Sequence, residues 1–383
     1  MNDRDRRDAR RDVLRELGGR NDTIEEVLRY GENPFDAAKA PPPPVFPMAE
    51  EPHVQVWRDY LNPAPSDFFA CLQERLPQLS IPITEGTAST DAYRDVVRRG
   101  KPFAEDAFAG TLSLERPDLF RVFVGDHPSG ALPVLVTPHR RDFETLDRAL
   151  GFRNEPVPIN PSVNAHTVAG FINWDRVRRH QAAWMAAAGG TSWASEMERV
   201  MKNESWRFYD RFILLCARSY SGVESAELGL DLDEQAWIER STVLRLEHEF
   251  THYATKRVYD AMNTNVLDEV ICDWAGITKA LGRFRADWFL RFLGLEGLPE
   301  IREGARVLAY LPGLGDDAVA LVCRLTARAA AGVEALHDEL YREEERPRFL
   351  LALTRLTMEL LASDERKRYF LEGYDEAGRM LGV

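Results

Sequence analysis

Cysteine is scarce in this sequence, and its spacing argues against both a disulfide scaffold and a cysteine-rich metal site. Among 383 residues there are four cysteines and no C-x-x-C pair; the four are Cys71, Cys216, Cys272 and Cys323. Scattered cysteines of this kind are usually free thiols in a reducing compartment. We therefore expect a cytoplasmic protein.

Long hydrophobic runs are also missing. No stretch approaches the roughly 18 apolar residues of a membrane helix. The charged opening MNDRDRR is not followed by the apolar segment of a secretory signal. Hydrophobic residues still make up 44% of the chain, which is the share of a globular protein with a core. We therefore expect that the protein does not associate with a membrane.

Positive charge is outnumbered, and lysine in particular is rare. The chain has 62 acidic and 49 basic residues, of which only six are lysine, and its net charge is −13. No basic stripe with interleaved aromatic residues is present, so we expect no nucleic-acid partner. The preference for arginine over lysine is typical of GC-rich bacterial genomes.

One stretch has a clear chemical pattern. Residues 248–252 read H-E-x-x-H, and histidines at i and i+4 project from one face of a helix, where both can reach one metal ion. Glu249, next to His248, could act as a general base on a metal-bound water. Apolar residues at helical spacing predict that this helix is buried; they are Leu244, Leu246, Phe250, Tyr253, Ala254 and Val258.

The helix that follows is expected to supply a third ligand. The polar break N-T-N at 263–265 precedes a run of apolar positions from Val266 to Leu281, and Gly282 is placed to end this helix. The helix includes Glu269 and, four positions later on the same face, Asp273. Cys272, between them, is expected to face the core.

H-E-x-x-H followed by E-x-x-x-D on the next helix resembles the gluzincin zinc metalloproteases, which include the thermolysin-like enzymes. The resemblance covers the stretch 244–282, and its ligand spacing is slightly shorter than is usual in thermolysin-like enzymes. It implies that His248, His252 and Glu269 bind Zn²⁺ and that Glu249 is the base. It also implies that Asp273 hydrogen-bonds a ligand histidine and fixes its tautomer. The metzincin extension, H-x-x-G-x-x-H, is absent.

The motif has alternatives that the sequence leaves open. Two histidines and one carboxylate are also the ligand set of non-haem iron oxygenases, which would use Fe²⁺ to modify a peptide or a natural-product intermediate. Such an enzyme usually needs an arginine for a 2-oxoacid cosubstrate, and the sequence offers Arg245, Arg257, Arg283 and Arg285.

Two further alternatives involve no reaction. The histidines and Glu249 could form a charged core cluster with Arg245, Lys256 or Arg257. The chain could also be a non-catalytic protein that keeps a gluzincin scaffold for binding. Glu249 argues against this last alternative, because a structural zinc site needs no base.

A metal hydrolase usually has a further donor that stabilises the oxyanion opposite the metal. We select Tyr310 from the candidates Tyr259, Arg283, Tyr310 and His337, and we expect His337 to face solvent.

The rest of the chain predicts three regions. Residues 1–44 form a charged N-terminal arm, with two short amphipathic helices broken at Gly18-Gly19 and a proline-rich linker near 38–44. Residues 45–190 form an α/β region on the substrate side. Residues 191–383 form the metal-binding region with a mostly helical C-terminal lobe.

The predicted strands precede the H-E-x-x-H motif in the sequence. The runs 119–124 and 132–136 predict a pair of adjacent strands, and 208–217 predicts a buried strand. Residues 155–175 predict a long Pro/Asn-rich loop, including His166, that could line a substrate pocket. Gly86 to Thr90 could bind an anion at a helix N-terminus, although a plain cap is the simpler interpretation.

We therefore expect a helix-rich α+β fold, with a small sheet upstream of the H-E-x-x-H helix pair. The predicted activity is zinc-dependent hydrolysis of peptide or amide bonds, with Glu249 activating the water. The expected partner is a peptide or small-molecule substrate, and the oligomeric state stays open.

Overall fold

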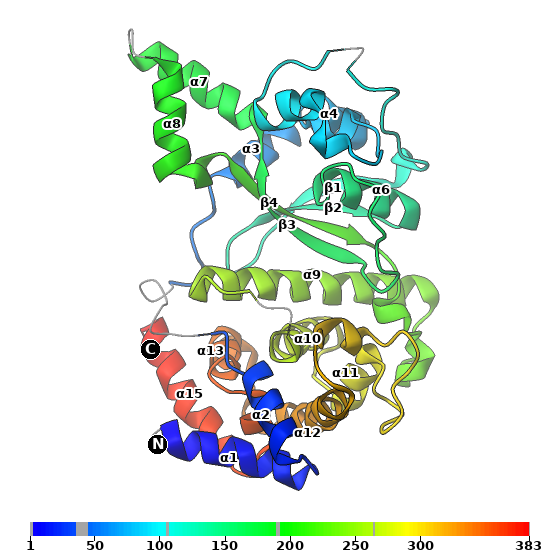
Figure 1. The fold of residues 1–383 in the computed structure, drawn as a ribbon, viewed down its shortest axis with the longest axis vertical. Helices are drawn as coiled ribbons and strands as arrows, with labels where there is room; N and C mark the ends of the chain where they lie inside the picture. Colours follow the sequence, from blue (N-terminus) through cyan, green and yellow to red (C-terminus); the bar gives the residue numbers. More distant parts are fainter. Residues whose placement is uncertain (1–2, 36–44, 105–106, 189–191, 263–264, 383) are drawn as a thin grey trace. The chain divides into compact units, whose positions relative to one another are not determined.

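The computed structural model describes residues 3–35, 45–104, 107–188, 192–262 and 265–382. Helices account for 59% of the chain, and a mixed sheet of four strands completes the helix-rich α+β fold that the sequence predicts. The chain forms two compact units, residues 47–218 and residues 1–46 together with 219–383 (Figure 1). Among the helices of the described ranges, none combines the length and the apolar character needed to cross a membrane.

The sheet belongs to the unit formed by residues 47–218. Its strands are β1 (Arg121–Gly125), β2 (Leu132–Thr137), β3 (Ala165–Ile172) and β4 (Tyr209–Cys216), in the order β1-β2-β4-β3. β2 pairs antiparallel with β1 and parallel with β4, and β3 pairs antiparallel with β4. The two central strands are buried at most positions, as expected for strands covered on both faces. The predicted strands at 119–124, 132–136 and 208–217 are confirmed.

The helices of this unit are mostly short. They are α3 (His53–Tyr60), α4 (Phe68–Gln73), α5 (Asp91–Tyr93), α6 (Arg140–Leu150), α7 (Trp174–Ala188) and α8 (Trp193–Asn203). Side chains from α3, α4 and α6 share one hydrophobic core with residues of all four strands, including Trp57, Phe143, Val168 and Phe212.

The long loop predicted at 155–175 is wrong over its second half. Residues 165–172 form β3, which pairs with β4 from Ala165↔Leu215 to Ile172↔Tyr209, with a register shift between Ala169 and Phe171. This strand contains Gly170 at φ +71° and few large apolar residues. Its own sequence therefore favours a strand only weakly, and the backbone hydrogen bonds to β4 decide its conformation.

The second unit is helical in the described ranges. Its longer helices are α1 (Asp3–Glu16), α2 (Asn21–Tyr30), α9 (Glu234–Tyr259), α10 (Val266–Leu281), α11 (Ala286–Leu293), α12 (Asp316–Leu340), α13 (Arg346–Leu353), α14 (Met358–Ala362) and α15 (Arg366–Leu381). The expected helical C-terminal lobe is thus present. Figure 1 shows α9 and α10 in yellow-green.

The ends of α9 and α10 follow ordinary capping chemistry. The Asp233 carboxylate accepts from Ala236 N at 2.8 Å, and the Asn265 side chain accepts from Asp268 N at 3.0 Å. Gly282 ends α10 at φ +83°, a conformation that glycine adopts without steric cost. These caps determine where α10 begins and therefore which way its acidic residues point.

The N-terminal segment forms the two predicted helices but is not a separate arm. Leu14 of α1 and Val27 of α2 are fully buried in the core of the helical unit. Asn33 donates to the carbonyl oxygens of Thr354 and Leu356, at 2.8 and 3.2 Å. The observed boundaries, after residues 46 and 218, therefore differ from those expected at 44 and 190. The proline-rich linker at 38–44 lies outside the described residues.

Candidate metal centre

The centre lies between α9 and α10, where the second helix runs back along the first. Contacts pair His252 with Asp268, His248 with Asp273, and Leu244 with Gly276. The two helices approach closely because Gly276 has no side chain: a Cβ there would lie 2.5 Å from the Leu244 carbonyl oxygen. Side chains from the two facing surfaces therefore meet within one buried layer.

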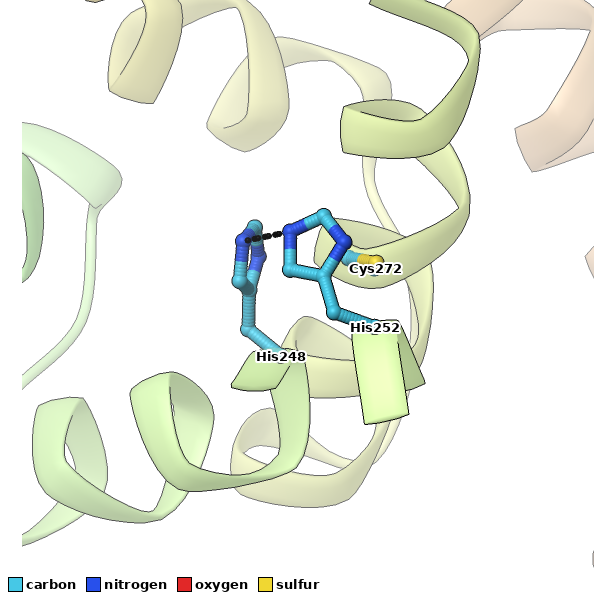
Figure 2. A group of neighbouring side chains, drawn as sticks. All are labelled: His248, His252 and Cys272. Atoms are coloured by element: carbon cyan, nitrogen blue, oxygen red, sulfur yellow. Dashed lines mark hydrogen bonds between the residues drawn. The ribbon is translucent and has the colours of Figure 1, made fainter. Parts of the chain in front are cut away.

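Three donor groups converge at the centre of this layer. The Nε2 atoms of His248 and His252 lie 3.1 Å apart (Figure 2). Glu269 places Oε2 3.5 Å from Nε2 of His248 and Oε1 3.6 Å from Nε2 of His252. A tetrahedral zinc ion with bonds of about 2.0–2.1 Å holds its donor atoms about 3.3–3.4 Å apart. The observed separations are close to that value.

The other ring nitrogen of each histidine faces a carboxylate. Nδ1 of His248 lies 2.7 Å from Oδ1 of Asp273, and Nδ1 of His252 lies 3.1 Å from Oδ2 of Asp268. A carboxylate at Nδ1 keeps the proton there and leaves Nε2 as a lone-pair donor. Both imidazoles are thus oriented with Nε2 toward Glu269.

Cys272 also belongs to the neighbourhood of the histidines. His248, His252 and Cys272 are all buried and offer ligand atoms within 4.8 Å of one another, a cluster that could hold a metal ion. Figure 2 shows the sulfur beside the His252 ring, on the side away from His248. The thiol donates to Oδ1 of Asp268 at 3.8 Å, and burial raises the pKa of Cys272 well above its usual value.

A second layer of polar side chains surrounds the Asp273 carboxylate. Arg306, on the 3₁₀-helix η9 (Arg306–Tyr310), contacts Asp273 and lies 3.4 Å from Oε2 of Glu269. The Tyr220 hydroxyl donates to Oδ1 of Asp273 at 2.5 Å. Burial opposes ionisation of Asp273, but Arg306 and His248 outweigh burial and lower the pKa of Asp273 to about 2.

The same competition operates at Glu269 and His252. Burial alone would raise the pKa of Glu269, yet His252, His248 and Arg306 hold this pKa below its usual value. Burial alone would lower the pKa of His252, yet Cys272 and Asp268 raise it well above its usual value. Without a metal the site is therefore a buried array of ion pairs.

The two remaining predicted site residues lie beside this array. Glu249 directly follows His248 on α9 and is half-buried. Tyr310 is half-buried at the end of η9, and the Arg306 guanidinium lies 5.8 Å from its ring centre. Burial raises the pKa of Tyr310 well above its usual value, and the nearby Glu269 carboxylate raises it further.

The other oxyanion candidates have different surroundings. Tyr259 shares a hydrogen bond with Thr354 Oγ1 at 2.7 Å, and Arg283 pairs with Asp338 at 3.1 Å. His337 was expected to face solvent, and this expectation is wrong. Its side chain is buried, and its Nδ1 accepts from the Trp274 indole at 3.2 Å, because the apolar face of α12 turns it into the core.

The cations considered as partners of the histidines make other contacts. Arg245 donates to Ser219 O at 3.3 Å, and Lys256 pairs with Asp260 at 2.8 Å. Arg257 lies over the Tyr253 ring, at 5.6 Å from its centre. In the contacts described here, the histidines pair instead with carboxylates of α10.

Three residues of this array are not predicted from the sequence to belong to it. Asp268 had a usable signal, since it precedes Glu269 and lies sixteen positions after His252. Tyr220 and Arg306 lie 53 and 33 positions from their common partner Asp273. No short motif links positions at such distances, so only the fold reveals them.

Comparison with known proteins identifies a family but no activity. Residues 12–365 match a family of unknown function, DUF7005. Because this match covers most of the chain, the protein belongs to that family. No curated protein and no solved structure matches the chain.

Proposed function

We propose that this protein is a zinc-dependent hydrolase of peptide or amide bonds, with His248, His252 and Glu269 as the metal ligands. The observation that supports this most directly is the convergence of two Nε2 atoms and one carboxylate within 3.1–3.6 Å of one another. Two histidines and one glutamate are a known catalytic zinc set, which leaves a coordination position open.

The charge of the site favours a divalent cation. Asp268, Glu269 and Asp273 are buried carboxylates, with exposed fractions of 0%, 3% and 0%. Arg306 contacts two of them. When these four groups are ionised and both imidazoles are neutral, as metal binding requires, they leave two negative charges in a buried layer, which is costly without compensation. A divalent cation would supply that compensation.

Glu269 is a better third ligand than Cys272. The Glu269 oxygens lie on the Nε2 side of both imidazoles, at 3.5 and 3.6 Å. Cys272 lies on the side of His252 away from His248 (Figure 2), near the nitrogen that pairs with Asp268. A thiolate ligand there would displace the carboxylate that orients His252.

A bound zinc ion supplies Lewis-acid chemistry, since it polarises a substrate carbonyl and lowers the pKa of a coordinated water. Glu249 would accept a proton from the attacking water at its carboxylate and pass it to the leaving nitrogen. Tyr310, whose raised pKa keeps the hydroxyl protonated, would donate a hydrogen bond to the carbonyl oxygen as negative charge develops there. Asp268 and Asp273 would hold the imidazoles in place.

Metal analysis is the first test of the ligand set. We expect about one zinc per chain in protein purified without added metal, because the three donors match zinc chemistry. Glu269→Ala should lose the metal, and the matched Cys272→Ala should keep it.

Each other outcome of this experiment has a consequence. Loss in Cys272→Ala but not in Glu269→Ala would replace the carboxylate with the thiol in the ligand set. Iron in place of zinc would favour the oxygenase alternative, to be tested by oxygen and 2-oxoacid consumption. An absence of metal from the wild type, even after incubation with zinc, would refute the proposal.

The role of Glu249 is tested separately. Glu249→Gln removes the proton acceptor but no proposed ligand, so it should keep its zinc and lose most cleavage of a peptide library, by about 10²–10⁴-fold. The control is Glu239→Gln, an exposed glutamate on the same helix, which should cleave like the wild type. Undiminished cleavage by Glu249→Gln would exclude it as the base.

A further inference from the structure

The unit formed by residues 47–218 contains a cavity that the proposed metal chemistry does not use. Its volume is about 600 Å³, within the roughly 300–1,000 Å³ typical of small-molecule sites. One wall is apolar, with Leu150, Val168, Phe171 and Ile172. Arginine, histidine, tyrosine and glutamine side chains complete the lining. The cavity therefore offers both an apolar surface and hydrogen-bonding groups.

Two arginines at this cavity have no anionic partner among the residues that the structure describes. Arg98 and Arg153 both line it, both are exposed, and neither makes a hydrogen bond or an ion pair with any described residue. Both act on the same neighbour: burial raises the pKa of Tyr93 to about 12, and the two arginines counteract this rise. Two unpaired guanidinium groups near one tyrosine form a site suited to carboxylate or phosphate.

The backbone holds Arg153 in an unusual conformation. Arg153 and Asn154 have φ values of +57° and +60°, a left-handed region that residues with a branched or long side chain rarely adopt. The buried Asn154 amide donates to the carbonyl oxygens of Gln78 and Ile81, at 2.9 and 2.8 Å. The strain at Arg153 is thus imposed by its neighbour, and strain of this kind is concentrated at functional sites.

Arg98 is positioned by a helical turn. It ends a π-helical turn, Arg94–Arg98, and such turns are frequent at functional sites. The turn is held by the Trp174 indole, which donates to Val97 O at 2.7 Å. Gly100, at φ +65°, packs so closely on the Trp174 ring that a Cβ there would overlap with it. Both arginines are therefore on segments with a defined conformation.

The carboxylate of Glu155, close to Arg153 in the sequence, accepts hydrogen bonds from another segment. Glu155, two residues after Arg153, accepts from the backbone N–H groups of Gly86 and Ala88 at 2.9 and 2.8 Å. The anion site considered at residues 86–90 thus binds a carboxylate of the protein itself. This arrangement keeps Glu155 from neutralising Arg153.

Two further polar groups face the cavity. His166 has Nδ1 at 2.6 Å from Oδ1 of the buried Asp147, which fixes the orientation of its ring. Gln78 is 3% exposed, and its Oε1 is buried with no hydrogen-bond partner among the described residues. A buried acceptor without a donor is costly.

We propose that this cavity binds a small organic anion, with its carboxylate or phosphate group between Arg98 and Arg153 and its apolar body against Val168 and Phe171. This inference does not depend on the metal centre.

Calorimetric titration of the full chain tests the proposal with three probes. Phenyl phosphate and phenylacetate present the two anionic groups on an apolar ring, and 2-phenylethanol is the neutral analogue. We expect at least one anion to bind and the neutral probe to bind at least ten-fold more weakly. The anion that binds more tightly identifies the group that the site recognises.

Substitutions then locate the site. Arg98→Gln and Arg153→Asn should each weaken binding of the preferred anion by about ten-fold or more, the loss expected for a charge-assisted hydrogen bond. Asn is chosen at position 153 because it tolerates a positive φ. The control is Arg178→Gln, an exposed arginine on α7 that does not line the cavity and has no partner among the described residues.

The outcomes separate the possibilities. Wild-type affinity in the control, with weakened binding and an unchanged melting temperature in the other two variants, supports the proposal. An equal loss in Arg178→Gln would mean non-specific attraction to arginine, and no binding of either anion at 10 mM would refute the site.

Discussion

At the scale of single residues, the proposed metal centre depends on carboxylates that are not themselves proposed as metal ligands. Asp273 is held by Arg306 and Tyr220, whereas Asp268 contacts Nδ1 of His252 and the Cys272 thiol. Each histidine thus has its own orienting carboxylate.

Asp268→Asn provides a test of this orienting role. The substitution keeps the side-chain size but removes the charge facing His252, so zinc affinity should fall by about 10–100-fold. Competition with a chromogenic chelator measures this change. Glu359→Gln is the matched control, since Glu359 is a fully buried carboxylate of the same unit paired with Arg10. A similar loss of affinity in both variants would indicate general destabilisation instead.

At the scale of elements, the close approach of α9 and α10 sets the distance between the histidines and Glu269. The contact depends on Gly276, which lies three residues after Asp273 and faces the turn of α9 that precedes His248. Side chains on two helices can share one metal only if the helix axes are held at a defined separation.

Gly276→Ala should therefore disturb both stability and metal binding. A Cβ 2.5 Å from the Leu244 carbonyl oxygen forces the helices apart, which we expect to cost about 1–3 kcal/mol of unfolding free energy. Denaturant titration and zinc affinity measure the two effects together. Lys279→Ala, at an exposed position on the same helix, should change neither. A stabilised Gly276→Ala variant would show that the helices have room to adjust.

The elements were predictable to different degrees. The caps at Asp233, Asn265 and Gly282 and the apolar periodicity of α9 and α10 are local signals, and the structure has these helices where the sequence predicts them. β3 was missed because its conformation depends on pairing with residues of β4 that lie 37 to 50 positions later in the chain.

At the scale of the whole molecule, the chain forms two units, and one of them is assembled from separate segments. Residues 1–46 join residues 219–383. The Tyr30 hydroxyl, at the end of α2, accepts from Val266 N at 3.0 Å and donates to Tyr310 O at 3.2 Å. The N-terminal segment therefore contacts the start of α10 and the segment that includes Tyr310.

This organisation predicts that metal removal affects one unit only. A ligand present at 100 times its Kd adds about 2.7 kcal/mol to the stability of the unit that binds it. A chelator should therefore lower one thermal transition by roughly 5–10 °C. Scanning calorimetry measures both transitions. The Glu269→Ala variant should no longer respond to the chelator, and an equal shift of both transitions would contradict the assignment of the metal to the helical unit.

Local sequence signals were sufficient to predict the pair of helices that contains the candidate metal ligands. Helical periodicity, capping residues and the spacing of His248, His252, Glu269 and Asp273 all act within a few turns of chain, so they can be read without the fold. The central strands and the helical C-terminal lobe were predictable for the same reason.

Which distant residues join the site, and where the cavity of the other unit lies, could be learned only from the fold. Tyr220 and Arg306 reach Asp273, and Arg98 and Arg153 line one cavity, because segments far apart in sequence pack together. The charge and size of these residues are compatible with many positions in a fold. Their roles follow from long-range packing, which no local pattern records.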